Sequence, residues 1–469
     1  MSILRGKRLK DQPLEIAKFT SSANTDQRIV EHVISINIAH TLSLLREGAI
    51  PRSDGVKCLK ALLSLDPQKI DIAVSDEDVH VTIERLVSEL AGPSGGFLNL
   101  AKSRNDQVAT ALRMEARRAL ANIALELCDL ISALLTKAKA EQNSLMPYYT
   151  HLQRAQPTTV AHVLLAHAHA LERDLERTFF VLKNVNLCPM GAAAGCGSTI
   201  KIDRKRIAKI LAFDGVLQNT IDAVATRDFV LDAIFVASSI MSNLSVLCEH
   251  LILWSTKEFN FVRLSDEHVS TSSAMPHKRN PVVPEIIRAK SSQVVGKLIA
   301  AFSIVNALPY GYNLDLQELN ALLFDTFDVT QQSLKIATQL VQKLEFLKES
   351  LDRATKDHSL CSTDLAEWLC VEKKIPYREA YHYVGDAIVH GDLKADKAQT
   401  LSVLDPQKSV QKRATEGGPS KLSTTFQIRA LSAKIFKVKR RIFVKLKIFD
   451  EVPLKISQEA KKEVMNIDS

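Results

Sequence analysis

The order of apolar and polar residues predicts long amphipathic helices. In the stretch 107–146, apolar residues recur in steps of four and three, at Leu112, Ala116, Leu120, Ile123, Leu127, Leu130 and Leu134. This spacing places all of these side chains on one face of a helix. At about 1.5 Å per residue, a helix over most of this stretch is several tens of Å long. Such a helix needs long neighbours, so we expect an elongated bundle whose apolar faces are covered by other copies of the chain.

Residues that interrupt helices are scarce. The chain contains 16 Gly and 15 Pro in 469 residues, roughly half their usual share. Neither residue occurs in the stretches 107–146, 158–188, 216–275 and 312–375. We therefore predict an all-α fold with a long central helical bundle.

The two ends of the chain have shorter periodic blocks and breaks such as Gly92-Pro93 and Gly417-Gly418-Pro419. They predict two smaller helical end domains. The expected division is an N-terminal helical domain at residues 1–105, a central bundle and oligomer core at 106–355, and a C-terminal helical domain with a basic tail at 356–469.

The net charge of +8 is concentrated in one place. Segment 434–447 contains seven Lys or Arg residues and no acid, so the remainder of the chain is nearly neutral. In the same segment Ile442, Val444, Leu446 and Ile448 alternate with other residues, a period of two that predicts a strand. Nucleic-acid or membrane binding by this tail is one interpretation. We favour a solvated edge or a crossing onto a neighbouring surface.

The cysteines and the apolar stretches indicate in which cellular compartment we expect the protein. The seven cysteines form no C-x-x-C pair and are odd in number, which predicts reduced thiols. The basic N-terminus is not followed by the apolar block of a secretory signal. The longest uncharged stretch with a helical pattern, 233–248, is short for a membrane span. We expect a soluble, cytoplasmic protein with no membrane partner.

One polar segment between the long helices has unusual chemistry. Residues 265–284 read SDEHVSTSSAMPHKRNPVVP, with tandem serines followed by His277, Lys278 and Arg279. A serine is a poor base in water, but fixed cations and backbone donors make its alkoxide accessible and can hold the charge of a carbanion. An ordinary Ser/Pro loop with solvated cations explains the segment equally well.

Three further polar segments lie at helix ends. Residues 149–157 include His151, which could exchange protons near neutral pH, although a lone His is more often structural. Residues 102–107 offer Ser103 or Asn105 as a helix N-cap, and Arg104 beside them suits a carboxylate. Residues 312–318 could simply be a capped first turn.

Together, and in this order, these segments resemble the signature regions of the aspartase/fumarase superfamily. SSAMPHKRNP resembles its S-S-x-M-P-x-K-x-N-P loop, and SRNDQ, YTHLQRAQP and YNLDLQE resemble the argininosuccinate lyases within it. Further matches lie at 19–26, 75–84 and 222–229, and the likeness continues to 417–420. The resemblance implies conversion of L-argininosuccinate to L-arginine and fumarate in arginine biosynthesis. It also implies a homotetramer with active sites built from three subunits, and no metal or organic cofactor.

The resemblance also implies residue roles. Ser272 would be the base, Lys278 and Asn280 would hold the aci-carboxylate, and His151 would be a catalytic His paired with Glu285. Substrate-binding positions would be Ser22, Arg104, Asn105, Thr150, Arg227, Asn280, Tyr312 and Gln317.

Some positions depart from the family pattern. Lys102 replaces the usual Arg, and Asn320 replaces the usual Lys three positions after Gln317. These departures leave two alternatives open: a related fumarate-releasing carbon-nitrogen lyase with a different amine product, or an inactive structural protein on the same scaffold.

Two other signals have simpler explanations. The glycine-rich segment 191–197 lacks the Gly-Lys-Ser/Thr of a phosphate loop, so we expect a loop near the site. His162, His167 and His169 do not share the spacing of a helical metal pair. We therefore predict no metal site.

Overall fold

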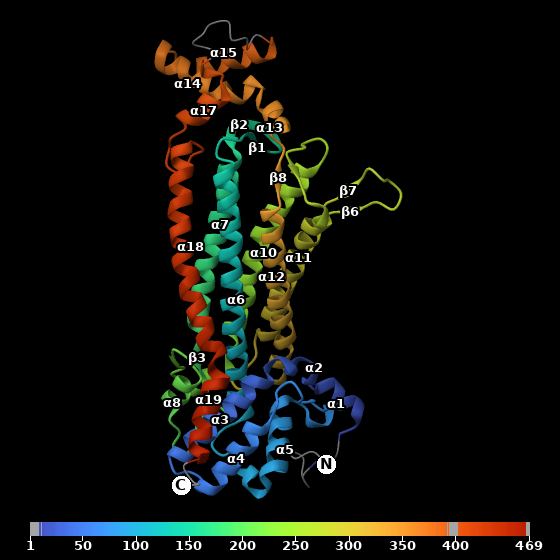
Figure 1. The fold of residues 1–469 in the computed structure, drawn as a ribbon, viewed down its shortest axis with the longest axis vertical. Helices are drawn as coiled ribbons and strands as arrows, with labels where there is room; N and C mark the ends of the chain where they lie inside the picture. Colours follow the sequence, from blue (N-terminus) through green and yellow to red (C-terminus); the bar gives the residue numbers. More distant parts are fainter. Residues whose placement is uncertain (1–8, 11, 392, 394–401, 466–469) are drawn as a thin grey trace.

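The computed structural model describes residues 9–10, 12–391, 393 and 402–465. Its centre is an elongated bundle of long helices that run side by side along the longest axis (Figure 1). The main members are α6 (Arg104–Ala140), α7 (Val160–Val185), α10 (Asp228–Ser255), α11 (Val282–Val305) and α12 (Glu318–Gln342). The predicted all-α fold with a long central bundle is confirmed.

Helix α6 is the central helix of the bundle. It begins at a capping box, in which the Ser103 hydroxyl accepts from backbone amides of the first turn and the Asp106 carboxylate accepts from the Ser103 amide. Its 37 residues correspond to a length of about 55 Å. The predicted apolar face is buried along its whole length, from Leu112 to Leu134. Burial of this face, rather than helix propensity alone, stabilises so long a helix.

Shorter helices form the base of the molecule, at the lower end of the view in Figure 1. They are α1 (Leu14–Thr20), α2 (Ala23–Asp26), α3 (Val30–Arg46), α4 (Arg52–Ser64) and α5 (Val79–Ala91), with the 3-10 turns η1 (Gln27–Ile29), η2 (Val74–Asp76) and η3 (Gly92–Phe97). Helices α8 (Arg204–Ile210) and α9 (Thr220–Ala225) lie in the long connection between α7 and α10.

The opposite end holds α13 (Lys348–Thr355), η6 (His358–Cys361), α14 (Ser362–Lys373), α15 (Tyr377–Val389) and α17 (Pro406–Lys412). A small core of its own lies here, around Leu365, Ala380 and Leu404. Helix α18 (Lys421–Asp450) then runs back along the bundle, and α19 (Val452–Met465) packs on α3 and α4. The last segment of the chain therefore contacts both ends of the molecule, and the three domain boundaries remain a prediction.

The predicted strand after residue 434 is wrong, because these residues belong to α18. The buried residues Ile428, Ile435, Ile442 and Phe449 recur every seven positions and face the bundle. The apparent alternation arose because Val444 and Ile448, two of its four members, are apolar but exposed. Exposed apolar side chains hid the helical period in the sequence.

The basic residues of α18 fasten it to neighbouring helices. Lys434 bonds to Glu172 and Glu176 of α7 at 2.5 Å each, and Lys445 bonds to Asp214 at 2.9 Å. Lys439 pairs with Asp129 of α6. Several cations of segment 434–447 therefore form ion pairs with acids of the same chain, because α18 crosses the surface of the bundle.

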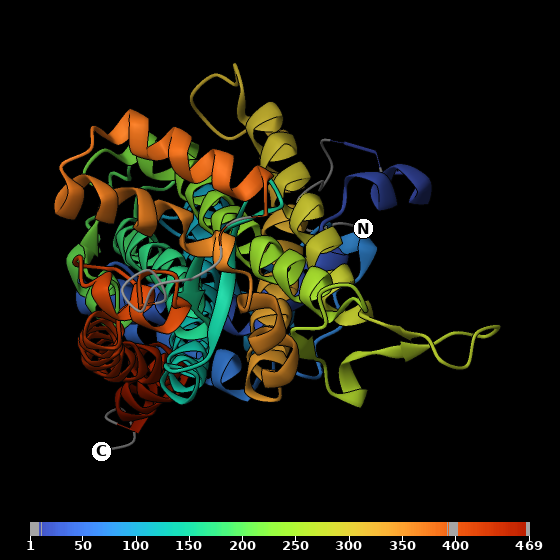
Figure 2. The same cartoon turned by 90° about the horizontal axis from the view of Figure 1, so that it is seen from above.

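Strands are short and occur in pairs. Strands β1 (Leu145–Thr150) and β2 (Gln153–Thr159) form an antiparallel hairpin, as do β6 (Ser270–Thr271) and β7 (Arg279–Asn280). The parallel pair is β3 (Leu187–Cys188) with β4 (Gly215–Val216), and β5 (Val262–Arg263) pairs with β8 (Glu345–Phe346). The 3-10 turns η4 (Asp266–His268) and η5 (Leu314–Gln317) precede β6 and α12. The loop between β6 and β7 projects far from the bundle (Figures 1 and 2).

Helices α6 and α10 are long and apolar enough to span a membrane, but 67% and 56% of the residues in their most apolar windows are buried inside the molecule. Such burial is typical of core helices in a soluble protein. The seven cysteines form no disulfide with one another, and five of them are buried.

Candidate active site

A cavity of about 320 Å³ lies where the base helices meet the bundle. Its lining includes four of the predicted substrate-binding residues: Arg104, Asn105, Tyr312 and Gln317. They come from the start of α6 and from the segment around η5, which are more than 200 positions apart in the sequence but adjacent here. We call this cavity the base pocket.

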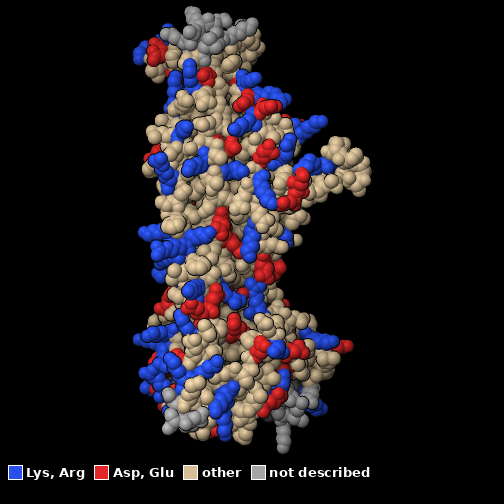
Figure 3. Space-filling model, in the orientation of Figure 1, with Lys and Arg blue, Asp and Glu red and all other residues tan. Residues whose placement is uncertain are grey.

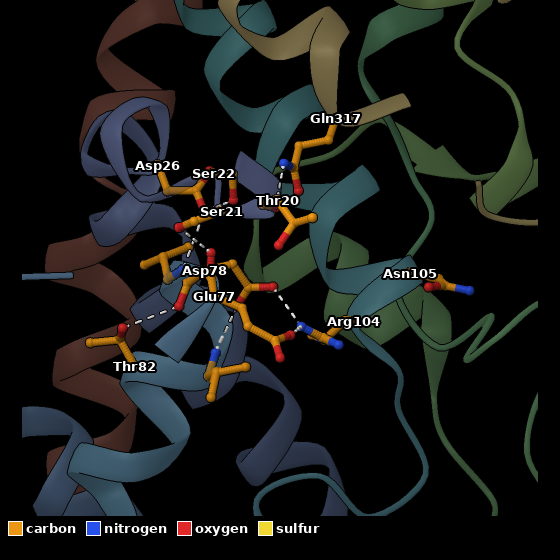
Figure 4. Close-up of polar contacts among 12 residues, drawn as sticks. Thr20, Ser21, Ser22, Asp26, Glu77, Asp78, Thr82, Arg104, Asn105 and Gln317 are labelled. Atoms are coloured by element: carbon orange, nitrogen blue, oxygen red, sulfur yellow. Dashed lines mark hydrogen bonds and ion pairs between the residues drawn. The ribbon is translucent and has the colours of Figure 1, made fainter. Parts of the chain in front are cut away.

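Arg104 is held by two carboxylates of the same pocket. Its Nη1 donates to Asp78 Oδ2 at 2.9 Å and to Glu77 Oε2 at 3.3 Å (Figure 4). Asp78 also caps α5, because its Oδ1 accepts from the Val81 amide at 2.9 Å. Our sequence reasoning did not identify Glu77 and Asp78 as site residues. The signal was available in the segment 75–84, which matched the family but was not assigned a role.

Ser22 lies beside this pocket in a network centred on Asp26. Its hydroxyl donates to Asp26 Oδ2 at 2.6 Å, and the Val79 amide donates to the same oxygen at 3.2 Å. Burial raises the pKa of Asp26 to about 6, although these hydrogen bonds favour the charged form. The Gln317 amide donates to the Thr20 carbonyl at 3.1 Å, which ties η5 to the end of α1. Ser22 and Gln317 are thus fixed by contacts between distant segments.

Asn105 and Arg227 make different contacts. Figure 4 shows Asn105 directed away from the two carboxylates, and its amide reaches the Ala194 carbonyl at 3.5 Å. Arg227 is only 1% exposed and does not line the base pocket. Its Nη1 donates to the Val224 and Thr226 carbonyls, and burial lowers its pKa to about 10, while Tyr312 nearby acts in the opposite direction.

Thr150 and His151 lie at the far end of the bundle, in the β1–β2 hairpin (Figure 1). His151 and Leu152 form the turn, with φ angles of 53° and 57°. Two left-handed residues in a row are typical of a type I′ hairpin, in which Asn and Gly are usual. Placing a His there costs backbone strain, a feature that often accompanies functional positions.

Ser272 lies at the start of the projecting loop between β6 and β7. Its Oγ accepts from the backbone amides of Ala274 at 3.3 Å and Met275 at 3.1 Å. Two amide donors on one oxygen stabilise a negative charge there. Lys278 and the partly buried Asn280 lie on the returning side of the loop, and the exposed Glu285 in the first turn of α11. Toward its tip the loop carries little charge (Figure 3).

Within one chain, therefore, the predicted site residues form three separate groups. The base pocket lies at one end of the bundle, the His151 hairpin at the other, and the Ser272 loop projects sideways (Figure 1). The hypothesised pairing of His151 with Glu285 is not formed inside the chain, because these residues belong to different groups.

Comparisons with known proteins identify the family. A family model described as Lyase matches residues 7–296. The argininosuccinate lyase of Methanothrix thermoacetophila is 40% identical over 439 residues, covering 89% of this chain and 90% of that protein. The argininosuccinate lyase of Carboxydothermus hydrogenoformans is 35% identical over 450 residues, covering 92% and 98%.

The chain belongs to the argininosuccinate lyase family. It is an enzyme of the carbon-nitrogen lyase class and has the fold of the aspartase/fumarase superfamily. Among solved structures, that of EDDS lyase in complex with formate matches with a TM-score of 0.83 and 26% identity, covering 97% of this chain and 94% of that one.

Of two departures from the argininosuccinate lyase pattern, Lys102 is partly buried and Asn320 is buried. The ammonium of Lys102 contacts Asn37 Oδ1, and burial lowers the pKa of Lys102 to about 7. Asn320 is 4% exposed in the first turn of α12. An amide there carries no charge, so electrostatic attraction for a substrate carboxylate must come from other residues.

Proposed function

We propose that this lyase catalyses the reversible elimination of L-argininosuccinate to L-arginine and fumarate in arginine biosynthesis. The observation that carries the proposal is Ser272 Oγ on an outward loop, with two amide donors on its oxygen and Lys278 in the same loop. The family to which the chain belongs supports the same reaction. The reaction needs a base beside cationic groups, and this loop supplies both.

In this mechanism Ser272 removes a proton from the methylene carbon of the succinyl group, which is bonded to the carbon that carries the departing nitrogen. The electron pair is first held in the substrate carboxylate as an aci-carboxylate, which Lys278 and Asn280 stabilise. The pair then forms the carbon-carbon double bond of fumarate as the carbon-nitrogen bond breaks. The departing guanidinium nitrogen keeps the bonding electrons and gains a proton, with the pair of His151 and Glu285 as the catalytic group nearby.

Binding of the substrate is assigned to the remaining positions. Ser22, Arg104, Asn105, Tyr312 and Gln317 would bind it from the base pocket, with Thr150 and Asn280 reaching it from the other two groups. Because Arg227 is buried, it would act through its neighbour Tyr312. A substrate with three carboxylates accounts for this density of amides and cations.

The active enzyme is proposed to be a homotetramer. The three groups of one chain are too dispersed to act together, so complete sites require other copies. Helices α10 and α11 expose large apolar side chains, including Phe235, Val246, Ile299 and Phe302, each at least 50% exposed. Exposed apolar side chains along long helices suit burial against further copies of the bundle. Unpaired cysteines agree with a proposed cytoplasmic location.

The assigned substrate is tested by fumarate release, followed by ultraviolet absorbance, with argininosuccinate and adenylosuccinate offered separately. We expect turnover of argininosuccinate alone. Turnover of a different amine adduct of fumarate would favour the alternative that the Asn320 departure left open, a related lyase with another amine product. No turnover by a folded tetramer would favour a structural protein on the same scaffold.

A further inference from the structure

A second and larger cavity, of about 690 Å³, lies beside the β1–β2 hairpin. Its walls come from the hairpin, from the segment 257–261 between α10 and β5, and from α13. None of the residues predicted for the reaction lines it. We call it the hairpin cavity.

The hairpin cavity has an excess of positive charge. Three cations line it: Arg154 of β2, Lys257 of segment 257–261 and Arg353 of α13. The lining contains one acid, Glu258. In the part of the chain that the structure describes, none of these three cations forms an ion pair or a side-chain hydrogen bond. Nearby Arg263, in contrast, is paired with Glu345. Unpaired cations around one concave surface repel each other, and an anion bound between them relieves that repulsion.

The elements that carry these cations contact each other, since α13 packs against β1 of the hairpin. The Asn260 amide donates to Ser350 Oγ at 2.9 Å, which joins segment 257–261 to α13. The Phe261 amide donates to the Trp254 carbonyl, and the Leu347 amide donates to the Phe261 carbonyl, both at 2.9 Å. The cavity is therefore formed in advance of any ligand, which reduces the entropic cost of binding.

Aromatic rings lie next to the cations. Tyr149, Phe259 and Phe261 all line the cavity, and the rings of Tyr149 and Phe259 are 5.4 Å apart. Arginine forks bind phosphate oxygens in pairs, and lysine adds a point charge. The volume lies within the range of small-molecule sites. Cations beside aromatic rings suit a phosphate chain that is attached to a planar group.

We propose that the hairpin cavity is a binding site for a di- or triphosphate group, separate from the site of the elimination. The ligand contacts Arg154, Lys257 and Arg353 and so joins the hairpin that carries His151 to α13. This site is independent of the substrate assignment, because it uses none of the residues given a role in the reaction.

Isothermal titration of the full-length wild-type enzyme in magnesium-free buffer tests the proposal, with inorganic triphosphate and ATP as separate probes. We expect saturable binding of one anion per chain that weakens as salt is added. Lys257→Gln and Arg353→Gln should each weaken binding about tenfold, since each removes one charge-assisted contact. Glu258→Gln should strengthen it. The matched control is Lys437→Gln, an exposed cation of α18, which should bind as the wild type does.

The two probes distinguish the sources of the phosphate chain. Tighter binding of ATP than of triphosphate identifies a nucleotide ligand, and equal binding identifies a free polyphosphate. Absence of saturable binding, or an equal loss in Lys437→Gln, would overturn the proposal. Displacement of the anion by argininosuccinate would also overturn it, since the cavity would then belong to the substrate site. Fumarate release measured on the same samples shows separately whether the proposed reaction holds.

Discussion

The carboxylate of Asp106 accepts a hydrogen bond from the backbone amide of Gly191 at 3.0 Å, across 85 positions of sequence. The same oxygen accepts from the Ala193 amide at 2.9 Å, while the other oxygen accepts from the Ser103 amide at 3.1 Å. Gly191 and Ala193 have φ angles of 84° and 51°, which are left-handed conformations that need support. One buried side chain therefore fixes both the start of α6 and the loop that contacts Asn105.

Replacing Asp106 should impair both stability and substrate binding. Asp106→Ala leaves two buried loop amides without an acceptor and removes part of the cap, at a cost of about 2 to 4 kcal/mol. It should also raise the KM for argininosuccinate, because Asn105 lies in the base pocket. Asp203→Ala is a matched control, since Asp203 caps α8 through the Arg206 amide, away from this pocket. Thermal unfolding and KM of both variants check this. An unchanged KM in a folded Asp106→Ala enzyme would refute the positioning role.

Acid should destabilise the protein partly through His40. Its Nε2 donates to the Leu100 carbonyl at 2.7 Å, and burial lowers its pKa from 6.5 to about 3. As the pH falls through 6.5, the unfolded chain takes up a proton that the folded chain does not take up until about pH 3. The free energy of unfolding therefore falls as the pH decreases through this window, by up to about 1.4 kcal/mol per pH unit.

His40→Gln removes this contribution and should flatten the dependence of the unfolding temperature on pH between about 6.5 and 3. The exposed His382→Gln is the control and should keep the wild-type dependence. An identical pH dependence in His40→Gln and wild type would contradict the assignment.

Helix α18 should be anchored by one aromatic residue. The guanidinium of Arg117 lies between the rings of Phe213 and Phe449, at 4.2 and 4.5 Å, and donates to the Leu211 carbonyl at 2.6 Å. Phe449→Ala should lower the free energy of unfolding by about 3 kcal/mol or more. Phe443→Ala, 62% exposed on the same helix, should change it little. Equal losses in chemical denaturation would show that Phe449 is not a special anchor.

The proposal that active sites are shared between subunits predicts complementation. Ser272→Ala and Asn105→Ala should each be nearly inactive alone. If the chains are unfolded and refolded together, mixed tetramers should recover up to about a quarter of wild-type activity, because two independent subunits must each contribute the intact residue. Fumarate release from the refolded mixture is the measurement. Recovery no greater than the sum of the separate variants would mean that sites are not shared.

The sequence predicted the long helices well because they contain few Gly or Pro residues and their large apolar residues are periodic. Leu112 to Leu134 repeat with the period of the helix, and Ser103 with Asp106 encodes its start. It failed for α18, where exposed Phe443 and Val444 obscured the period of Ile435, Ile442 and Phe449. The period of the apolar residues indicates the secondary structure only when the apolar residues are the buried ones. A helix that also has apolar residues on its exposed face is therefore misread from the sequence.

The candidate site was predictable only as separate motifs. Arg104, Tyr312 and Gln317 were expected to bind substrate, and the structure brings them to one cavity. The contacts of Arg104 with Glu77 and Asp78 join residues that are 27 and 26 positions apart, and no local pattern encodes such a contact. In the structure of one chain, Ser272 does not line this cavity, and the proposed tetramer is what would bring the two together.

The central claim is that Ser272 is the base of an argininosuccinate elimination. The most direct test compares fumarate release from argininosuccinate by wild type, Ser272→Ala and Ser273→Ala, the neighbouring serine being the matched control. We expect Ser272→Ala to lose activity by about a hundredfold to ten-thousandfold, with an unchanged unfolding temperature, and Ser273→Ala to retain most of it. Full activity in Ser272→Ala would contradict the account.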